Sequence, residues 1–115
     1  MPANSIESLR HQHCVPRKGK EDALSTPDLE SGLALLPDWR LAAERNEILK
    51  EFRFADYFHT MAFVNAVATI AHREDHHPDL AVHYAKCEVT FATHDAGGVT
   101  LNDVICAAKT ERLFA

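Results

Sequence analysis

Apolar and polar residues alternate along two stretches of the chain, and such alternation predicts β-strands with one buried face. The first stretch divides into two strands at a turn near Arg45 and Asn46. Its predicted inward-facing residues are Trp39, Leu41, Ala43, Ile48, Phe52 and Phe54. In the second stretch, 81–92, Cys87 and Phe91 share one face, so the pattern predicts a single long third strand.

A helical spacing of apolar residues replaces the alternation between these two stretches. From 55 to 73, Phe63 and Val67 belong to a stripe that recurs every three or four residues, as on the buried face of a helix. Asp56 suits the positive end of the helix dipole, and Pro78 sets the latest point at which the helix can end. The pattern therefore predicts one long helix here.

Two further helices are indicated by residues that favour helix N-termini. Thr26 precedes Pro27, which is favoured in a first helical turn. Thr100 is followed three residues later by Asp103, which resembles a capping box before a last helix. The predicted order is helix, strand, strand, helix, strand, helix. It indicates an α+β domain in which helices cover one face of a largely antiparallel sheet.

The first 25 residues lack this regularity. They are polar, contain Pro2, Pro16 and Gly19, and show no sustained period. We therefore expect residues 1–25 to form a flexible N-terminal arm and residues 26–115 to form the folded domain.

Composition and charge exclude several classes of protein. The net charge of −5 argues against a nucleic-acid-binding surface, which needs a basic patch. No apolar run approaches the roughly 20 residues that span a membrane. The three cysteines have no paired spacing, which suggests reduced thiols in a cytosol. These features predict a single soluble cytoplasmic domain with no direct nucleic-acid or membrane partner.

The candidate chemistry lies in a cluster of histidines. His76 and His77 adjoin at the predicted helix end before Pro78, and His94 follows the third strand. Histidine exchanges protons near neutral pH, and neighbouring acids such as Asp75 shift its pKa. Because no serine or cysteine nucleophile lies in a recognisable turn beside them, the pattern favours acid–base elimination or hydration.

Two other interpretations of the histidines compete with acid–base chemistry. Surface histidines are usually inert, and this applies best to those outside the cluster. A zinc site is suggested by His72 and His76, four residues apart. However, Arg73 stands where a zinc protease motif has Glu, and Cys87 and Cys106 lie on apolar stripes typical of a core. Acid–base chemistry without a metal is therefore favoured.

The same residues resemble the signature of the pterin-4a-carbinolamine dehydratases. The resemblance covers roughly residues 26–112. Its central anchors are His72, His76-His77-Pro78, Tyr84, His94 and Asp103. It extends outward to Trp39 after Pro37-Asp38, to Phe52-Arg53-Phe54, to Asp56-Tyr57-Phe58 and to Thr93 to Thr100. It implies the same order of helices and strands. It also implies dehydration of a 4a-hydroxytetrahydropterin to the quinonoid dihydropterin, a step in tetrahydrobiopterin recycling, with no metal and no bound cofactor.

The family's site residues transfer to this sequence by position. His76, His77 and His94 are implied as the catalytic histidines, with His77 at the centre. Which of His76 and His94 is the acid stays open. The implied substrate-binding residues are Asp75, Trp39, His72, Thr93 and Asp95, although position 72 is often Glu in the family and Trp39 is equally suited to the core.

The resemblance also implies assembly into homodimers or homotetramers. Some animal members bind the dimerisation helices of a transcription factor, so a non-catalytic binding module is the alternative function. An exposed edge of the strand predicted at 81–92 would provide a pairing surface. The side chain of the natural pterin is not indicated by the sequence.

Overall fold

The protein is built on a four-stranded antiparallel sheet in the order β1-β2-β4-β3. The structure is a computed structural model that describes residues 5–114. The strands are β1 (Arg40–Ala42), β2 (Glu47–Arg53), β3 (Asp79–Val82) and β4 (Lys86–Phe91). The helices are α1 (Ile6–Arg10), α2 (Thr26–Ala34), α3 (Tyr57–Glu74) and α4 (Leu101–Phe114), and short 3-10 turns are at Lys20–Asp22, Ala43–Arg45 and His94–Ala96.

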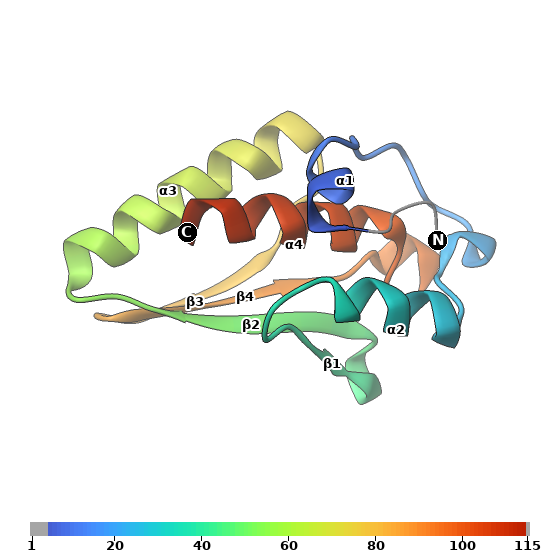
Figure 1. The fold of residues 1–115 in the computed structure, drawn as a ribbon, viewed down its shortest axis with the longest axis horizontal. Helices are drawn as coiled ribbons and strands as arrows, with labels where there is room; N and C mark the ends of the chain where they lie inside the picture. The colour runs from blue at the N-terminus through green and yellow to red at the C-terminus, as the bar shows by residue number, and fades with distance from the viewer. Residues whose placement is uncertain (1–4, 115) are drawn as a thin grey trace.

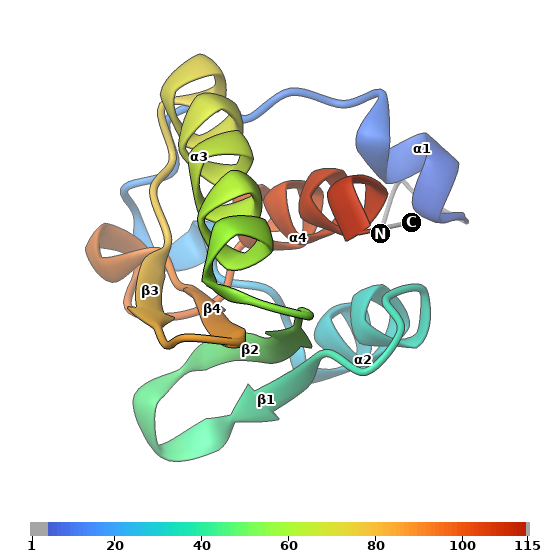
Figure 2. The same cartoon turned by 90° about the vertical axis from the view of Figure 1, so that its left-hand side faces the viewer.

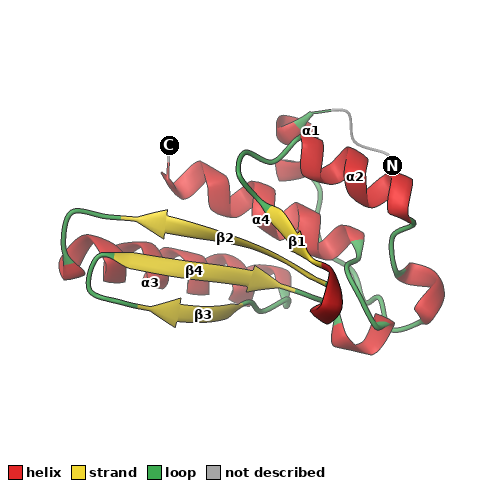
Figure 3. Ribbon diagram, turned by 90° about the horizontal axis from the view of Figure 1, so that it is seen from below, coloured by secondary structure: helices red, strands yellow, loops and turns green. Residues whose placement is uncertain are grey.

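The helices lie on one side of this sheet, as expected for the predicted α+β domain (Figure 1). Seen from below, the four strands lie in front and α3 and α4 lie behind them (Figure 3). Apolar side chains of the sheet and of these two helices form the core; they include Ile48, Phe52, Val89, Phe91, Phe63, Val67, Val104 and Ile105. The predicted fold class is therefore confirmed.

The long helix α3 matches the prediction from its apolar stripe. Phe63, Val67 and Ala71 are buried, and the Asp56 side chain caps the first turn by accepting from the His59 N–H at 2.9 Å. The helix ends because Asp75 adopts the left-handed conformation, with φ of 50°. This ending decides where the following histidines lie.

The single strand predicted at 81–92 is wrong. The chain instead forms a hairpin in which β3 and β4 pair on either side of 83–85, and Leu80 faces Val89. Because β4 is bonded to β2 on its other side, it has no free edge, and the short strand β3 takes the edge position. The sequence carries a signal of this turn, because the apolar positions change phase from Leu80, Val82 and Tyr84 to Cys87, Val89 and Phe91.

The two predicted helix starts differ in outcome. The last helix begins as expected, because the Thr100 N–H donates to Asp103 Oδ2 at 2.8 Å. In α2, however, the N-cap is Ser25 rather than Thr26, and the Ser25 hydroxyl accepts from the Asp28 N–H. Thr26 becomes the first helical residue.

The N-terminal segment also differs from the expectation of an arm outside the core. Residues 1–4 lie outside the described residues, but α1 packs on the outer side of α4 (Figure 2). Leu9 is fully buried in the core, and Arg10 Nε donates to the Ala108 carbonyl at 3.1 Å. Ile6 and Leu9 are spaced as on one helix face, but two apolar residues in a polar segment do not make a sustained period, so the sequence did not reveal this packing. No helix in residues 5–114 is long and apolar enough to cross a membrane.

Candidate active site

The end of α3 and the end of β4 bring the predicted histidines together. After the left-handed turn at Asp75, the His76 N–H donates back to the Ala71 carbonyl at 3.2 Å, which directs the chain away from the helix. His77 follows, and His94 lies in the 3-10 turn after β4. Because β4 is a central strand, its end is fixed by pairing on both sides.

His76 is anchored by a carboxylate that lies in the protein interior. His76 Nε2 is 2.6 Å from Asp103 Oδ1; the imidazole is 12% exposed and Asp103 is 0% exposed. The ring also stacks on Phe91, with 6.1 Å between centroids. A carboxylate only accepts hydrogen bonds, so Nε2 is assigned as the protonated nitrogen and Nδ1 as the one free to accept a proton.

Asp103 is held in turn by three donors. Its second oxygen, Oδ2, accepts from the Thr93 hydroxyl and from the Thr100 N–H, each at 2.8 Å. Together with His76 these contacts satisfy a fully buried carboxylate, which would otherwise be costly to bury. The network fixes the orientation of the His76 ring relative to α4.

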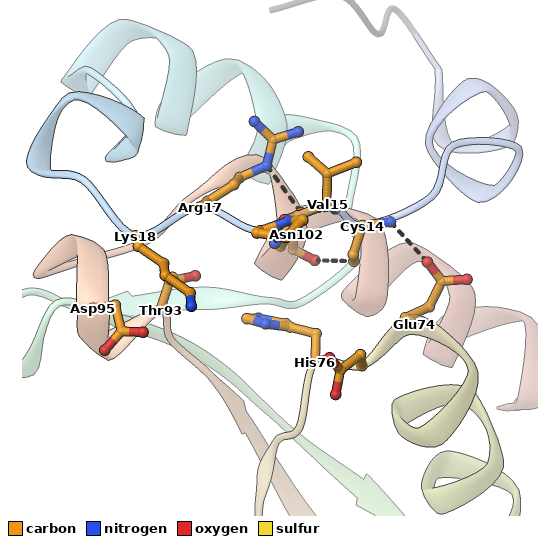
Figure 4. Close-up of a pocket in the computed structure, with 11 residues that line it drawn as sticks. Cys14, Val15, Arg17, Lys18, Glu74, His76, Thr93, Asp95 and Asn102 are labelled. Carbon is orange, nitrogen blue, oxygen red and sulfur yellow. Dashed lines mark hydrogen bonds between the residues drawn. The ribbon is translucent and has the colours of Figure 1, made fainter.

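Two adjoining cavities open beside this network. One, of about 270 Å³, lies under the N-terminal segment and is lined by Cys14, Val15, Pro16, Arg17, Lys18, Glu74, Asp75, His76, Thr93, Asp95 and Asn102 (Figure 4). The other, of about 280 Å³, is lined by Asp75, His76, His77, Ala92, Thr93, His94 and Asp95. Each is near the lower end of the size range of small-molecule pockets. All three predicted histidines therefore surround one cavity.

The N-terminal segment covers the first cavity and is fastened to α4. Asn102 Nδ2 donates to the Val15 carbonyl at 2.7 Å, and Asn102 Oδ1 accepts from Arg17 Nε at 2.9 Å. Figure 4 shows Lys18 extending from this segment toward Thr93 and Asp95. Arg17 and Lys18 thus add two cationic residues to a lining whose other charged residues are mostly acidic.

Comparisons with known proteins show the family of this chain. The family described as pterin 4 alpha carbinolamine dehydratase matches residues 22–113. The chain belongs to this family. A relative from Xanthomonas oryzae pv. oryzae, named "Putative pterin-4-alpha-carbinolamine dehydratase", is 55% identical over 92% of this chain and 90% of its own length. A relative of the same name from Xanthomonas campestris pv. campestris (strain B100) is 54% identical with the same coverage.

A solved structure shares the fold. The crystal structure of a transcriptional coactivator/pterin dehydratase from Brucella melitensis aligns with a TM-score of 0.78 and 30% identity. The alignment covers 81% of this chain and 99% of that one. The α+β architecture described above is thus that of a pterin dehydratase.

Most of the substrate-binding residues predicted from the family resemblance line these cavities. Asp75, Thr93 and Asp95 line both of them. The Asp75 side chain makes no hydrogen bond within residues 5–114, and the carboxylate that contacts His76 is that of Asp103. His72 is exposed on α3 and lines neither cavity, because the helix ends before His76 and the two do not share a helical face.

Trp39 lies in the core and lines neither cavity. It is 6% exposed and packs between Phe52 and Phe91, with ring centroids about 6 Å apart. Phe91 in turn stacks on His76, so Trp39 is one ring removed from the site. Trp39 is one of the predicted inward-facing residues of the first alternating stretch, and this pattern indicated its buried position.

The sequence alone did not identify several residues of the site. Asp103 was recognised as a capping residue and as an anchor of the family signature, but not as the partner of His76. Cys14, Arg17 and Asn102 were not expected in the site, since the segment containing the first two has no period and Asn102 lies on a helix predicted only from its cap.

Glu74 fastens the N-terminal segment to the end of α3. Its Oε1 accepts from the Cys14 N–H at 2.7 Å, and its Oε2 is 3.0 Å from His13 Nδ1 and 3.7 Å from Lys109 Nζ. Burial raises the pKa of the Glu74 carboxyl, but the Cys14 N–H, His13 and Lys109 together outweigh it, so this pKa is lowered from 4.5. The carboxylate therefore stabilises the folded state.

The lowered pKa of Glu74 predicts a pH-dependent loss of stability. Its contribution is fully present above the unfolded-state pKa, about 4.5, and is lost as the pH falls through the lower folded-state value. Glu74→Gln should lower the free energy of unfolding by about 1–3 kcal/mol at pH 7. Urea unfolding of both proteins from pH 7 to pH 3 should show this difference shrinking below about pH 4.5. A difference that is constant over this range would contradict the assigned role.

Proposed function

We propose that this protein removes water from 4a-hydroxytetrahydropterins by histidine acid–base catalysis. The observation that best supports this is the convergence of His76, His77 and His94 around one cavity, with His76 bonded to the buried Asp103. The product would be a quinonoid dihydropterin. Membership of the pterin dehydratase family supports the substrate class.

The proposed reaction needs one proton donor and one proton acceptor. The hydroxyl on C4a leaves as water when it is protonated, and the neighbouring ring nitrogen loses its proton. We assign His77 to the leaving hydroxyl, because it is exposed in the cavity. His76 is suited to act as the base, since Asp103 would stabilise the imidazolium that forms when Nδ1 takes the proton. His94 would then supply the proton.

In the cell, this reaction would regenerate a pterin cofactor spent by hydroxylation. Aromatic amino-acid hydroxylases release the 4a-hydroxy compound, and its dehydration returns the pterin to the cycle. This role is proposed from the family resemblance together with the arrangement of the histidines.

The proposed activity is tested by following dehydration of a freshly generated 4a-hydroxytetrahydropterin by ultraviolet absorbance. The compound dehydrates spontaneously, so the reference is a trace without protein. His72→Ala is the matched control, because this histidine is exposed and outside both cavities. We expect wild type and His72→Ala to exceed the reference equally. A wild-type trace that coincides with the reference would overturn the proposed function.

A second candidate function, a binding module that assembles with itself or with another protein, is favoured by one surface. Tyr57, Phe58 and Tyr84 are 52%, 74% and 68% exposed, and the rings of Tyr57 and Tyr84 stack 6.4 Å apart. Exposed aromatic clusters of this kind are typical of interaction sites. The Brucella melitensis protein is named both as a coactivator and as a dehydratase.

We accordingly expect the chain to form a homodimer or homotetramer. Light scattering coupled to size-exclusion chromatography should give a mass of two or four chains. Phe58→Ser should shift this mass toward a single chain, because it removes the most exposed of these rings. A single-chain mass for the wild type would contradict the expected assembly.

A further inference from the structure

Two thiols from distant parts of the sequence face each other beside the candidate active site. Cys14 Sγ in the N-terminal segment lies 3.5 Å from Cys106 Sγ in α4, and the two residues are 92 positions apart. Cys106 is fully buried and Cys14 is half-buried. The third thiol, Cys87, is buried in β4, and its Sγ contacts the Glu88 carbonyl.

Contacts on both sides of Cys14 hold its sulfur toward α4. The Cys14 N–H donates to Glu74 Oε1 at 2.7 Å, and the next residue, Val15, is bonded to Asn102 through both its N–H and its carbonyl. These contacts fix the backbone of the segment relative to α3 and α4. The approach of the two sulfurs is therefore a property of the folded chain and not of a free end.

The two thiols differ in their access to solvent and in their protonation. The hydrogen bond to Cys14 and burial raise the pKa of the Cys106 thiol, so Cys106 keeps its proton and can donate it to Cys14 Sγ. Cys14 is the partly exposed member and lines the cavity under the N-terminal segment. An oxidant from solvent therefore meets Cys14 first.

We propose that Cys14 and Cys106 form a redox pair, in which a peroxide oxidises Cys14 and Cys106 closes an intramolecular disulfide. In the first step the Cys14 sulfur attacks one peroxide oxygen, the O–O bond breaks, and Cys14 sulfenic acid and water (from hydrogen peroxide) are formed. In the second step Cys106 Sγ attacks Cys14 Sγ and the S–OH bond breaks. The hydroxyl leaves as water with the proton that Cys106 held. The peroxide is reduced by two electrons, and the two thiols are oxidised by two.

Closing the bond requires little movement. A disulfide has sulfurs about 2.05 Å apart, so the Cys14 side chain must approach by about 1.5 Å. The bond would join the N-terminal segment to α4 at the edge of the cavity that contains His76. It would also close a loop that spans most of the chain, which restricts the unfolded state and raises the melting temperature by roughly 10–20 °C.

The test is mass spectrometry of the intact, fully reduced protein after brief treatment with a small excess of hydrogen peroxide. We expect the monomer mass to fall by two hydrogen atoms and the melting temperature to rise, with both changes reversed by dithiothreitol. Trypsin alone leaves Cys87 and Cys106 on one peptide between Lys86 and Lys109, so a second protease that cuts after Glu88 is needed. The linked peptides should then contain Cys14 and Cys106.

Variants separate this pair from general thiol oxidation. Cys87→Ala should lose two hydrogens as the wild type does, whereas Cys106→Ala should instead gain oxygen atoms on Cys14. If Cys106→Ala does not fold, the peptide map of the oxidised wild type shows by itself whether Cys14 is bonded to Cys106. Oxygen gain on wild-type Cys14 without loss of hydrogen would overturn the proposal, as would a bond between two chains or a bond that involves Cys87.

Discussion

Asp103→Asn is expected to lower kcat for pterin dehydration by roughly 10²–10⁴-fold, the largest effect of a single replacement away from the cavity surface. An asparagine amide that faced His76 Nε2 would donate where the carboxylate accepts, and would favour the tautomer with the proton on the other nitrogen. It would also remove the charge that stabilises an imidazolium. Asp103 makes this contact at 2.6 Å while fully buried, so water cannot replace it.

The Asp103→Asn prediction needs a control for folding, because the same carboxylate caps α4 through the Thr100 N–H. Circular dichroism and a thermal melt should show that the variant is folded at the assay temperature. Asp79→Asn is the matched control, since Asp79 is exposed on β3 and lines neither cavity of the site. A folded Asp103→Asn variant that retained wild-type kcat would show that the contact with His76 has no role in catalysis.

Lys50→Met is expected to destabilise the protein by about 3–5 kcal/mol. Lys50 Nζ lies 2.5 Å and 2.9 Å from the two carboxylate oxygens of Glu111, and it donates to the Pro37 carbonyl at 2.9 Å. Lys50 and Glu111 are 8% and 7% exposed. Removing the lysine leaves a carboxylate buried between β2 and the end of α4 without its counter-charge, which is the main cost.

Two further variants test whether the cost of Lys50→Met comes from an unpaired buried charge or only from a lost ion pair. Lys50→Met combined with Glu111→Leu removes both charges and should lie within about 2 kcal/mol of the wild type. Arg53→Met breaks the exposed pair with Glu51, in which Arg53 is 74% exposed, and should cost no more than about 1 kcal/mol. The measurement is chemical unfolding of all four proteins. Equal losses in Lys50→Met and Arg53→Met would contradict this interpretation.

The elements with a clear period could be predicted from the sequence. Helix α3 followed from Phe63, Val67 and Ala71, and strands β1 and β2 followed from the first alternating stretch. The division of 81–92 into β3 and β4 was missed, although the apolar positions change phase at residues 85 and 86, between Tyr84 and Cys87. The burial of Lys50 in a central strand could not be predicted, since the sequence does not show that Glu111 of α4 forms an ion pair with it.

For the candidate site, the sequence indicated the residues that are close together along the chain. His76 and His77 were recognisable as a pair at a helix end, and His94 as a residue after a strand. The roles of Asp103 and of the Cys14–Lys18 segment depend on contacts over 27 positions or more. Contacts of this kind have no local pattern, so only the folded structure reveals them.

The most direct test of histidine catalysis is the rate of dehydration measured side by side for wild type, His77→Ala and a sample without protein. His77 is exposed in the cavity and its side chain makes no hydrogen bond or ion pair within residues 5–114, so the variant should fold normally. We expect the wild-type rate to lie well above the uncatalysed rate, and His77→Ala to lower the catalysed rate by roughly 10²–10⁴-fold. A His77→Ala protein as active as the wild type would contradict the account, because a site centred on these histidines could not tolerate that loss.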